Sequence, residues 1–404
     1  MMPALKVAII ADDLTGAMDT AGPFAAAGLK TRVRFNADCV AANLPGDLDV
    51  LACTTQTRHL SADVAAARVA DVVRALAGAA PKLLLKKIDT TLRGHVAAEL
   101  AAALRTCGRR HLLVAPAAPT QGRTMRGGEV FVHRVPLRQS NAAGDALSPA
   151  ASLPLAELLL QNVAGIHAHV LTRDAPLKLA GDSGPHAYPA DAETDSDLDR
   201  IAAFALRYCD DILLAGATGI GAALAHSLAE CRDVPACPEI SPKASTGRVL
   251  FVVGSRTAVT TEQLARLRAA DAEEIVVPVE HLSRVPAAAG AQFRKPVSLI
   301  LRPQAGGRGR SDEVARILAQ MAVALMHSLE VRGLVLTGGD TAAAVFDALG
   351  IRECVLVGEI MPGIPIGRLA GRHRSMLVVT KSGGYGDRDA LVRIAERLHA
   401  ASPA

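Results

Sequence analysis

Residues 6 to 19 read KVAIIADDLTGAMD, and this stretch decides the fold of the first half of the chain. Its apolar run ends at two adjacent acids, Asp12 and Asp13, and an alanine-rich segment follows. A short apolar run bounded in this way is typical of a buried strand that leads into a helix. The acids either cap that helix or form a catalytic centre. Because side chains alternate along an extended chain, we expect the two acids to point apart.

Similar apolar runs recur along the chain, and each is followed by a helical pattern or a polar loop. The first half contains KVAII, DVLACTT, KLLLKKID, HLLVAP and DILLAG, and the second half contains RVLFVVGS, EEIVVPV, VSLILRP, GLVLTGGDT, CVLVGEI and MLVVTKSGG. Strands that alternate with helices indicate βαβ units and a mostly parallel sheet. Residues 119–137 interrupt this rhythm and are typical of a glycine-rich loop and a hairpin. The acidic run near residue 195 is expected to cap and start a helix.

A segment rich in Pro, Ser and Lys separates the two series of strands and predicts a linker over residues 237–248. We therefore expect an α/β fold with two domains, residues 1–236 and 249–404. Each domain is expected to be a mostly parallel sheet flanked by helices. The active site is expected in the cleft between them, with the linker as the hinge.

The composition excludes several classes of protein. The 404 residues carry a net charge of +4 and contain no Trp, 3 Tyr and 7 Phe, which argues against a nucleic-acid partner. No run of 18 apolar residues suggests a membrane span, and we expect no membrane association. The 7 cysteines are scattered and form no C-x-x-C pair, so neither a disulfide framework nor a zinc site is supported. A reducing cytoplasm is the predicted location, and no signal peptide is recognised.

Four glycine-bearing loops lie in the second half, at residues 252–257, 336–341, 358–367 and 380–386, and three of them directly follow apolar strands. Glycine lets backbone N–H groups approach a phosphate closely, and a following helix adds a favourable dipole. One such loop is usually an ordinary turn, but four in one domain predict a phosphate or nucleotide site. Lys381 either reaches a phosphate or is a solvated loop lysine. Asp340 and Thr341 are expected to cap a helix, with contact to a nucleotide or metal as the alternative for Asp340.

The first half carries a different chemistry. Residues 86–94, KKIDTTLRG, place two lysines, an aspartate, two threonines and an arginine after an apolar run. Arg pairs with a carboxylate or phosphate through two hydrogen bonds, while Asp and Thr pair with hydroxyls. These residues suit a polyhydroxylated anion, although an ordinary basic turn is the alternative. Residues 120–128 add Arg123 and Arg126, which would otherwise be solvated surface arginines.

Nine segments together resemble the four-carbon acid sugar kinase family, in order along nearly the whole chain. They are IADDLTGAMD, KKIDTTLRG, GRTMRGG, DAETDSDL, AGATGIGAALA, VVGSRTAVTTEQL, LTGGDT, GEIMPGIPIG and TKSGGYGD. The resemblance implies a phosphotransferase that moves a phosphoryl group from ATP, with Mg²⁺, to a hydroxyl of a four-carbon sugar acid. D-threonate, giving D-threonate 4-phosphate, is the favoured substrate, with D-erythronate and 3-oxo-tetronate as alternatives. The first domain would bind the sugar acid and the second the nucleotide.

The motifs and the resemblance together assign the predicted site residues. Asp12 or Asp13 is expected to accept the proton of the attacking hydroxyl. The predicted substrate-binding residues are Thr15, Asp19, Lys87, Asp89, Thr90, Arg93 and Arg123. The predicted nucleotide-binding residues are Ser255, Gly338, Gly339, Asp340, Gly358, Glu359, Met361, Gly363, Lys381, Gly383 and Gly384. No metal ligands are assigned.

Two other functions are considered. A non-catalytic sugar-acid sensor would need the basic cluster but no nucleotide loops, so the glycine loops favour the enzyme. A dehydrogenase is disfavoured because the G-x-G-x-x-G fingerprint is missing. The oligomeric state is open, with a homo-oligomer among the options.

Overall fold

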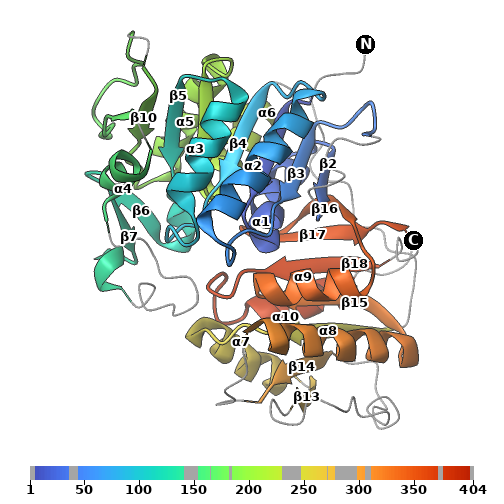
Figure 1. The fold of residues 1–404 in the computed structure, drawn as a ribbon. Helices are drawn as coiled ribbons and strands as arrows, with labels where there is room; N and C mark the ends of the chain where they lie inside the picture. Colours follow the sequence, from blue (N-terminus) through green and yellow to red (C-terminus); the bar gives the residue numbers. More distant parts are fainter. Residues whose placement is uncertain are drawn as a thin grey trace. The chain divides into compact units, whose positions relative to one another are not determined.

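The computed structural model describes residues 5–35, 44–140, 153–163, 165–181, 184–229, 247–270, 272–277, 298–304, 311–371 and 376–400. The chain forms two compact units, Met1–Ala236 and Cys237–Ala404. Figure 1 shows both, coloured along the sequence. Each unit has its own strands, helices and apolar core.

The N-terminal unit is built on one parallel sheet. Its strand order is β2-β3-β1-β4-β11-β5-β10-β9, and every neighbouring pair runs parallel. The strands are β1 (Val7–Ala11), β2 (Thr31–Arg34), β3 (Val50–Thr54), β4 (Leu83–Lys87), β5 (His111–Ala115), β9 (His167–Ala168), β10 (His186–Pro189) and β11 (Ile212–Gly216). The central strands are buried at every residue, as expected for a parallel sheet covered on both faces.

The described residues of this unit contain six helices. They are α1 (Leu14–Ala26), α2 (Ala62–Ala77), α3 (Val96–Cys107), α4 (Leu155–Asn162), α5 (Asp195–Arg207) and α6 (Thr218–Ala229). Helices α2 and α3 pack against each other, and α6 packs against both α1 and α5. Thr194 and Asp197 form a capping box at the start of α5, which confirms that the acidic run begins a helix.

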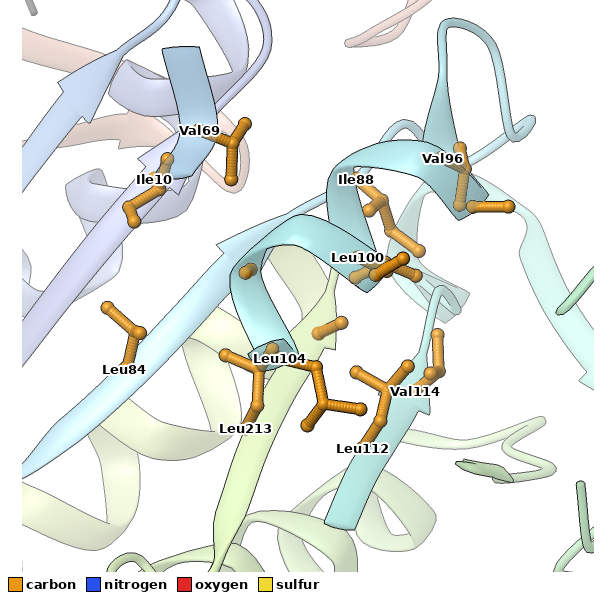
Figure 2. Close-up of a cluster of buried hydrophobic side chains, with 14 of the residues drawn as sticks. Ile10, Val69, Leu84, Ile88, Val96, Leu100, Leu104, Leu112, Val114 and Leu213 are labelled. Carbon is orange, nitrogen blue, oxygen red and sulfur yellow. The ribbon is translucent and has the colours of Figure 1, made fainter. Parts of the chain in front are cut away.

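The main apolar core of this unit lies between the sheet and the helices α2 and α3. Figure 2 shows Leu100 and Leu104 of α3 close to Leu112 and Val114 of β5 and Leu213 of β11. These side chains are almost fully buried. Burial of a Leu or Val side chain contributes about 1.5–3 kcal/mol to stability. This layer therefore holds the strands firmly, together with the loops that follow them.

A small antiparallel sheet follows β5. It consists of β6 (Arg123–Arg126), β7 (Glu129–Val132) and β8 (Val135–Pro136), and the short 3₁₀ helices Pro119–Gln121 and Leu137–Gln139 flank it. The predicted hairpin is therefore confirmed.

The C-terminal unit has a sheet with strand order β13-β14-β12-β15-β18-β17-β16. The strands are β12 (Arg248–Val253), β13 (Glu273–Val277), β14 (Leu299–Pro303), β15 (Val331–Thr337), β16 (Glu353–Met361), β17 (Ile364–Leu369) and β18 (Leu377–Lys381), and the helices are α7 (Ala258–Ala269), α8 (Ser311–Ser328), α9 (Gly339–Ala348) and α10 (Ala390–Ala400). The strands from β13 to β18 in this order run parallel, whereas β17 runs antiparallel to both β18 and β16. Helices α7 and α10 pack against each other, and so do α8 and α9.

The predicted α/β class with mostly parallel sheets is confirmed, but the strands β2, β9, β10 and β17 were not predicted. β2 was missed because its sequence, TRVR, alternates charged and apolar residues and lacks an apolar run. β17 lies in the stretch 358–367, which was interpreted as a glycine loop. Most of the predicted linker, residues 237–246, lies outside the described residues. Within the described ranges, no helix is both long and apolar enough to cross a membrane.

Candidate active site

Three loops of the N-terminal unit begin at the same edge of its sheet. β1 lies between β3 and β4, and its last residue, Ala11, is opposite Thr54 of β3 and Lys87 of β4. The loops that follow these three strands therefore start side by side. In open α/β sheets the carboxyl edge of the strands is where ligands bind.

Arg58 joins two of these loops. Its Nε donates to Asp12 Oδ2 at 2.7 Å, and its Nη2 donates to Asp12 Oδ1 at 2.9 Å. Nη2 also lies 3.8 Å from Asp89 Oδ1. Burial opposes ionisation of Asp12, but the charge and hydrogen bonds of Arg58 outweigh it and lower the pKa of Asp12 below its usual value. Asp12 is thus an ionised carboxylate with both oxygens occupied.

Asp13 is the N-cap of α1. Its Oδ1 accepts from the backbone N–H of Gly16 at 3.0 Å, and its Oδ2 accepts from Thr15 Oγ1 at 2.6 Å. Its Oδ1 also accepts from Arg58 Nη2 at 3.0 Å. The expectation that the two acids point apart is therefore wrong, because both converge on one guanidinium. β1 ends at Ala11, so strand alternation no longer governs the residues beyond it.

Asp89 and Arg93 form a second two-point ion pair. Arg93 Nε and Nη2 donate to the two oxygens of Asp89 at 2.9 and 2.8 Å. The backbone N–H and the hydroxyl of Thr91 also donate to Asp89, whereas the predicted ligand Thr90 is its buried neighbour. Burial opposes ionisation of Asp89, yet Arg93 and Arg58 hold its pKa well below the usual range.

A buried network supports these loops from the α3 side. Lys86 Nζ lies 2.7 Å from Glu99 Oε2, and both side chains are almost completely buried. Thr57 Oγ1 donates to Glu99 Oε1 at 2.6 Å, and Thr57 N donates to the carbonyl of Asp12 at 2.9 Å. Because Arg58 follows Thr57, the ion pair fixes the segment that delivers its guanidinium.

Lys87 faces the opposite side of the sheet, towards α1, because neighbouring strand residues alternate. A Cβ at Gly16 would lie only 2.9 Å from Lys87 Nζ, so the ammonium occupies the space that a side chain at position 16 would fill. The side chain is 2% exposed, and no hydrogen bond or ion pair engages its ammonium among the described residues. The carboxylates of Asp12, Asp19 and Asp89 act on its charge from beyond ion-pairing distance, so this position suits an anionic ligand.

Asp19 lies one helical turn beyond Thr15 and Gly16 on α1. Helical side chains lean towards the N-terminus, so its carboxylate covers the turn against which Lys87 lies. It accepts one hydrogen bond, from Thr20 Oγ1 to Oδ1 at 2.9 Å. Burial, partly offset by the charge of Lys87, raises the pKa of Asp19 to about 7.

Arg123 is the first residue of β6 and thus belongs to the small antiparallel sheet. Its Nη1 donates to the carbonyl of Gln121. Most of the predicted site residues of the first half therefore lie at the carboxyl edge of the parallel sheet. Arg123 does not, because it belongs to the small antiparallel sheet.

In the C-terminal unit, three loops meet at the carboxyl ends of the adjacent strands β12, β15 and β18. Gly254 N donates to the carbonyl of Thr337 at 3.2 Å, and Gly338 N donates to that of Lys381 at 3.1 Å. A Cβ at Gly383 would lie 2.3 Å from Ser255 Oγ. Ser255, Gly338 and Gly383 therefore lie together, in the place where nucleotide phosphates bind in such sheets.

Two helices begin at this edge. Thr257 caps α7, and its hydroxyl also donates to the carbonyl of Gly383 at 2.7 Å. Gly338, with a φ of +94°, is the N-cap of α9 and provides no side-chain cap. The prediction that Asp340 or Thr341 caps this helix is wrong, because α9 already starts at Gly339 and both residues lie inside its first turn. Asp340 lies in its first turn and accepts from Ser311 Oγ at 3.1 Å.

Lys381 organises the loop after β18. Its Nζ donates to the carbonyls of Ser382, Gly383 and Tyr385 at 3.1, 3.3 and 3.0 Å. Burial lowers the pKa of Lys381 to about 7. Gln263 Nε2 holds the same loop through the carbonyls of Tyr385 and Asp387 at 3.1 and 2.7 Å. The alternative of a solvated loop lysine is wrong, since Lys381 is completely buried.

The stretch 358–367 is a β-hairpin. Gly358, Glu359 and Met361 belong to β16, and Gly363 lies in the turn before β17. Gly363 N donates to Glu359 Oε1 at 2.8 Å. The interpretation of this stretch as a glycine-bearing loop is therefore wrong, because its glycines lie in a bulged antiparallel hairpin. Gly383 and Gly384 form the turn after β18.

Among the described residues, no group of three His, Cys, Asp or Glu side chains is suited to hold a metal ion. Mg²⁺ in phosphoryl-transfer sites needs fewer protein ligands than such a group provides, because one or two carboxylates and the nucleotide phosphates suffice. The carboxylate of Asp340, at the start of α9, is a donor of this type.

Comparison with known proteins agrees with this geometry. Residues 7–224 match the family model of a sugar-binding N-terminal domain, and residues 250–391 match that of a nucleotide-binding C-terminal domain. The chain thus combines a sugar-binding with a nucleotide-binding domain.

Relatives narrow this class further. The D-threonate kinase of Bordetella bronchiseptica is 33% identical over 97% of both chains, and that of Cupriavidus necator is 34% identical over 95% of both. The D-erythronate kinase of Heliobacterium modesticaldum is 29% identical over 95% of both chains. The chain belongs to the four-carbon acid sugar kinase family, which confirms the predicted resemblance and the phosphotransferase class. A solved structure from Salmonella typhimurium, 20% identical and covering 97% of this chain and 99% of its own, shares the fold with a TM-score of 0.80.

Sequence reasoning missed several residues that build these sites. Arg58 and Glu99 were not predicted, and neither was Gln263. Arg58 had one usable signal, because it follows β3 by four residues and β3 was recognised as a strand next to the first. Glu99 and Gln263 lie within helices, where nothing in their spacing distinguishes them from surface residues.

Proposed function

We propose that this protein is a D-threonate kinase, which transfers the γ-phosphoryl group of ATP to the 4-hydroxyl of D-threonate. The observation that carries the proposal is the ranking of the relatives. Relatives named D-threonate kinase are 34%, 33% and 30% identical, whereas a 3-oxo-tetronate kinase and a D-erythronate kinase are each 29% identical.

The N-terminal site has the chemistry that a sugar acid requires. The unpaired ammonium of Lys87 would bind the carboxylate, and the exposed side of Arg93 would assist it. The ionised carboxylates of Asp12 and Asp89 would accept hydrogen bonds from hydroxyls. Their own pairing with Arg58 and Arg93 holds them in position before the substrate arrives.

The C-terminal site has the chemistry that a triphosphate requires. Backbone N–H groups at the start of α9, the hydroxyl of Ser255 and the turn at Gly383 would surround the phosphates. Mg²⁺, held by phosphate oxygens with Asp340 as the protein carboxylate, would neutralise part of their charge. The reaction is proposed for the cytoplasm, where ATP is available and buried thiols such as Cys53 stay reduced.

The test is an ADP-release assay with ATP, Mg²⁺ and a panel of D- and L-threonate, D- and L-erythronate and their 3-oxo forms. The proposal expects the highest kcat/KM with D-threonate and a product phosphorylated at the terminal hydroxyl by nuclear magnetic resonance. Preference for another acid of the panel would refute the substrate assignment and leave the family intact.

A further inference from the structure

We propose that Asp19, and neither Asp12 nor Asp13, accepts the proton of the attacking hydroxyl. This inference rests on the proposed kinase reaction and assigns one of its roles. It departs from the sequence-based expectation, which gave this role to the adjacent acids of the first loop.

The first argument compares the acids of the N-terminal site by their partners. Asp12 has both oxygens bound by Arg58, and Asp89 has both bound by Arg93. Asp13 caps α1 and accepts from the hydroxyl of Thr15. Each of these carboxylates already receives two or more hydrogen bonds, so protonating one would break an ion pair or a helix cap.

Asp19 is different from all three. No cation lies within ion-pairing distance of it among the described residues, and its single hydrogen bond comes from the hydroxyl of Thr20. It is 4% exposed, so it can take up a proton without losing an ion pair and without competition from bulk water. A base works best when its pKa lies near the working pH, and burial places that of Asp19 there.

Lys87 and Asp19 lie over the same turn of α1. The ammonium of Lys87 approaches the Cα of Gly16, and Asp19 is three residues further along the helix on the same face. The charged and polar groups that act on Asp19 are Lys87 from β4, Asp89 from the following loop, Asp13 from the cap and Thr20 from its own helix. Lys87 is the cation among them.

The proposed step transfers one proton and one phosphoryl group. The O–H bond of the substrate breaks and its proton moves to the carboxylate of Asp19. The substrate oxygen forms a bond to the γ-phosphorus of the nucleoside triphosphate. The bond from that phosphorus to the bridging oxygen breaks, and the nucleoside diphosphate leaves with the electron pair.

The test measures kcat from pH 5 to 9 at saturating ATP and D-threonate for the wild type, Asp19→Asn and Thr20→Val. The wild type should lose activity below an apparent pKa of about 7. Asp19→Asn should lower kcat about 100-fold or more and remove this acidic limb, while isothermal titration calorimetry shows unchanged binding of both substrates. Thr20→Val keeps the side-chain shape but removes a hydrogen bond to the ionised form, so the limb should move to higher pH.

Several outcomes would overturn the inference. One is an Asp19→Asn enzyme within threefold of the wild-type kcat, and another is an acidic limb that Asp12→Asn removes and Asp19→Asn leaves. If Asp19→Asn does not fold, an unshifted limb in Thr20→Val decides against the inference. Asp63→Asn, on the exposed first turn of α2, is the matched control and should behave as the wild type. Wild-type inactivity on every acid of the panel would refute the proposed function and this inference with it.

Discussion

Replacing Asp19 by Asn should make the protein more stable at pH 8 while it lowers kcat about 100-fold or more. In the folded chain burial raises the pKa of Asp19 to about 7 from an unperturbed value of 3.8. Below pH 4 the carboxyl is protonated in both states and costs nothing. Between pH 4 and 7 the unfolded chain releases the proton and the folded chain keeps it, so stability falls as pH rises through this window.

The size of the effect follows from the width of the window. About 3 pKa units at 1.36 kcal/mol each give at most about 4 kcal/mol of destabilisation, present in full above pH 7. Asn resembles the protonated acid and can keep the hydrogen bond from Thr20. The free energy of unfolding of Asp19→Asn minus that of the wild type should therefore rise from near zero at pH 4 to at most about 4 kcal/mol at pH 8.

The assay is urea unfolding of the full chain at pH 4, 5, 6, 7 and 8, followed by circular dichroism. Because the chain has two units, we compare the transition that differs between the variants and assign it to the N-terminal unit. Asp63→Asn serves as the control, with a difference that stays flat across pH. A difference for Asp19→Asn that is flat as well, or negative at pH 8, would refute the reasoning, because it would mean that Asp19 is ionised in the fold throughout.

Three further predictions concern the frame of the two sites. Glu99→Gln leaves Lys86 as an uncompensated buried charge and should lower the free energy of unfolding by about 3–5 kcal/mol in urea, and a loss below about 1 kcal/mol would contradict a role for the pair. Arg58→Met removes the cation that Asp12, Asp13 and Asp89 share and should reduce kcat/KM for D-threonate at least about 10-fold in the ADP-release assay. Arg58→Lys should restore only part of this loss, because an ammonium cannot bind Asp12 at two points. Full recovery in Arg58→Lys would argue against the two-point pairing. Gly383→Ala drives a Cβ against Ser255 Oγ and should weaken ATP binding about 10-fold in calorimetry with D-threonate binding unchanged, whereas Gly181→Ala, where a Cβ meets open space, should alter neither.

The strands were predictable because they are buried on both faces and read as continuous apolar runs. KVAII, HLLVAP and DILLAG each correspond to a fully buried strand of the parallel sheet. β2 and β17 were not predictable on this basis. β2 carries charges in alternate positions, and the glycines and prolines around β17 indicate turns wherever they occur.

The candidate site was predictable to the level of the loops and no further. The pattern of polar residues directly after apolar runs placed Asp12, Lys87 and Asp89 in one predicted site, and these residues meet at the carboxyl edge of the parallel strands. It could not predict which acid has which role, because the roles depend on the carboxylate that Arg58 binds, and Arg58 is 46 residues away from Asp12 in the sequence. Nor could it separate Lys86 from Lys87, which are neighbours in sequence but serve opposite faces of one strand.

The position of the Lys87 ammonium against Gly16 has an evolutionary consequence. A Cβ at residue 16 would lie 2.4 Å from Asp13 Oδ1 and 2.9 Å from Lys87 Nζ, so both the helix cap and the ammonium oppose a substitution there. A shorter residue at 87 would remove only the second contact and would surrender the cation. When this scaffold is adapted to an uncharged substrate, a library that varies residues 13, 16 and 87 jointly should therefore yield functional combinations that single-site libraries never contain.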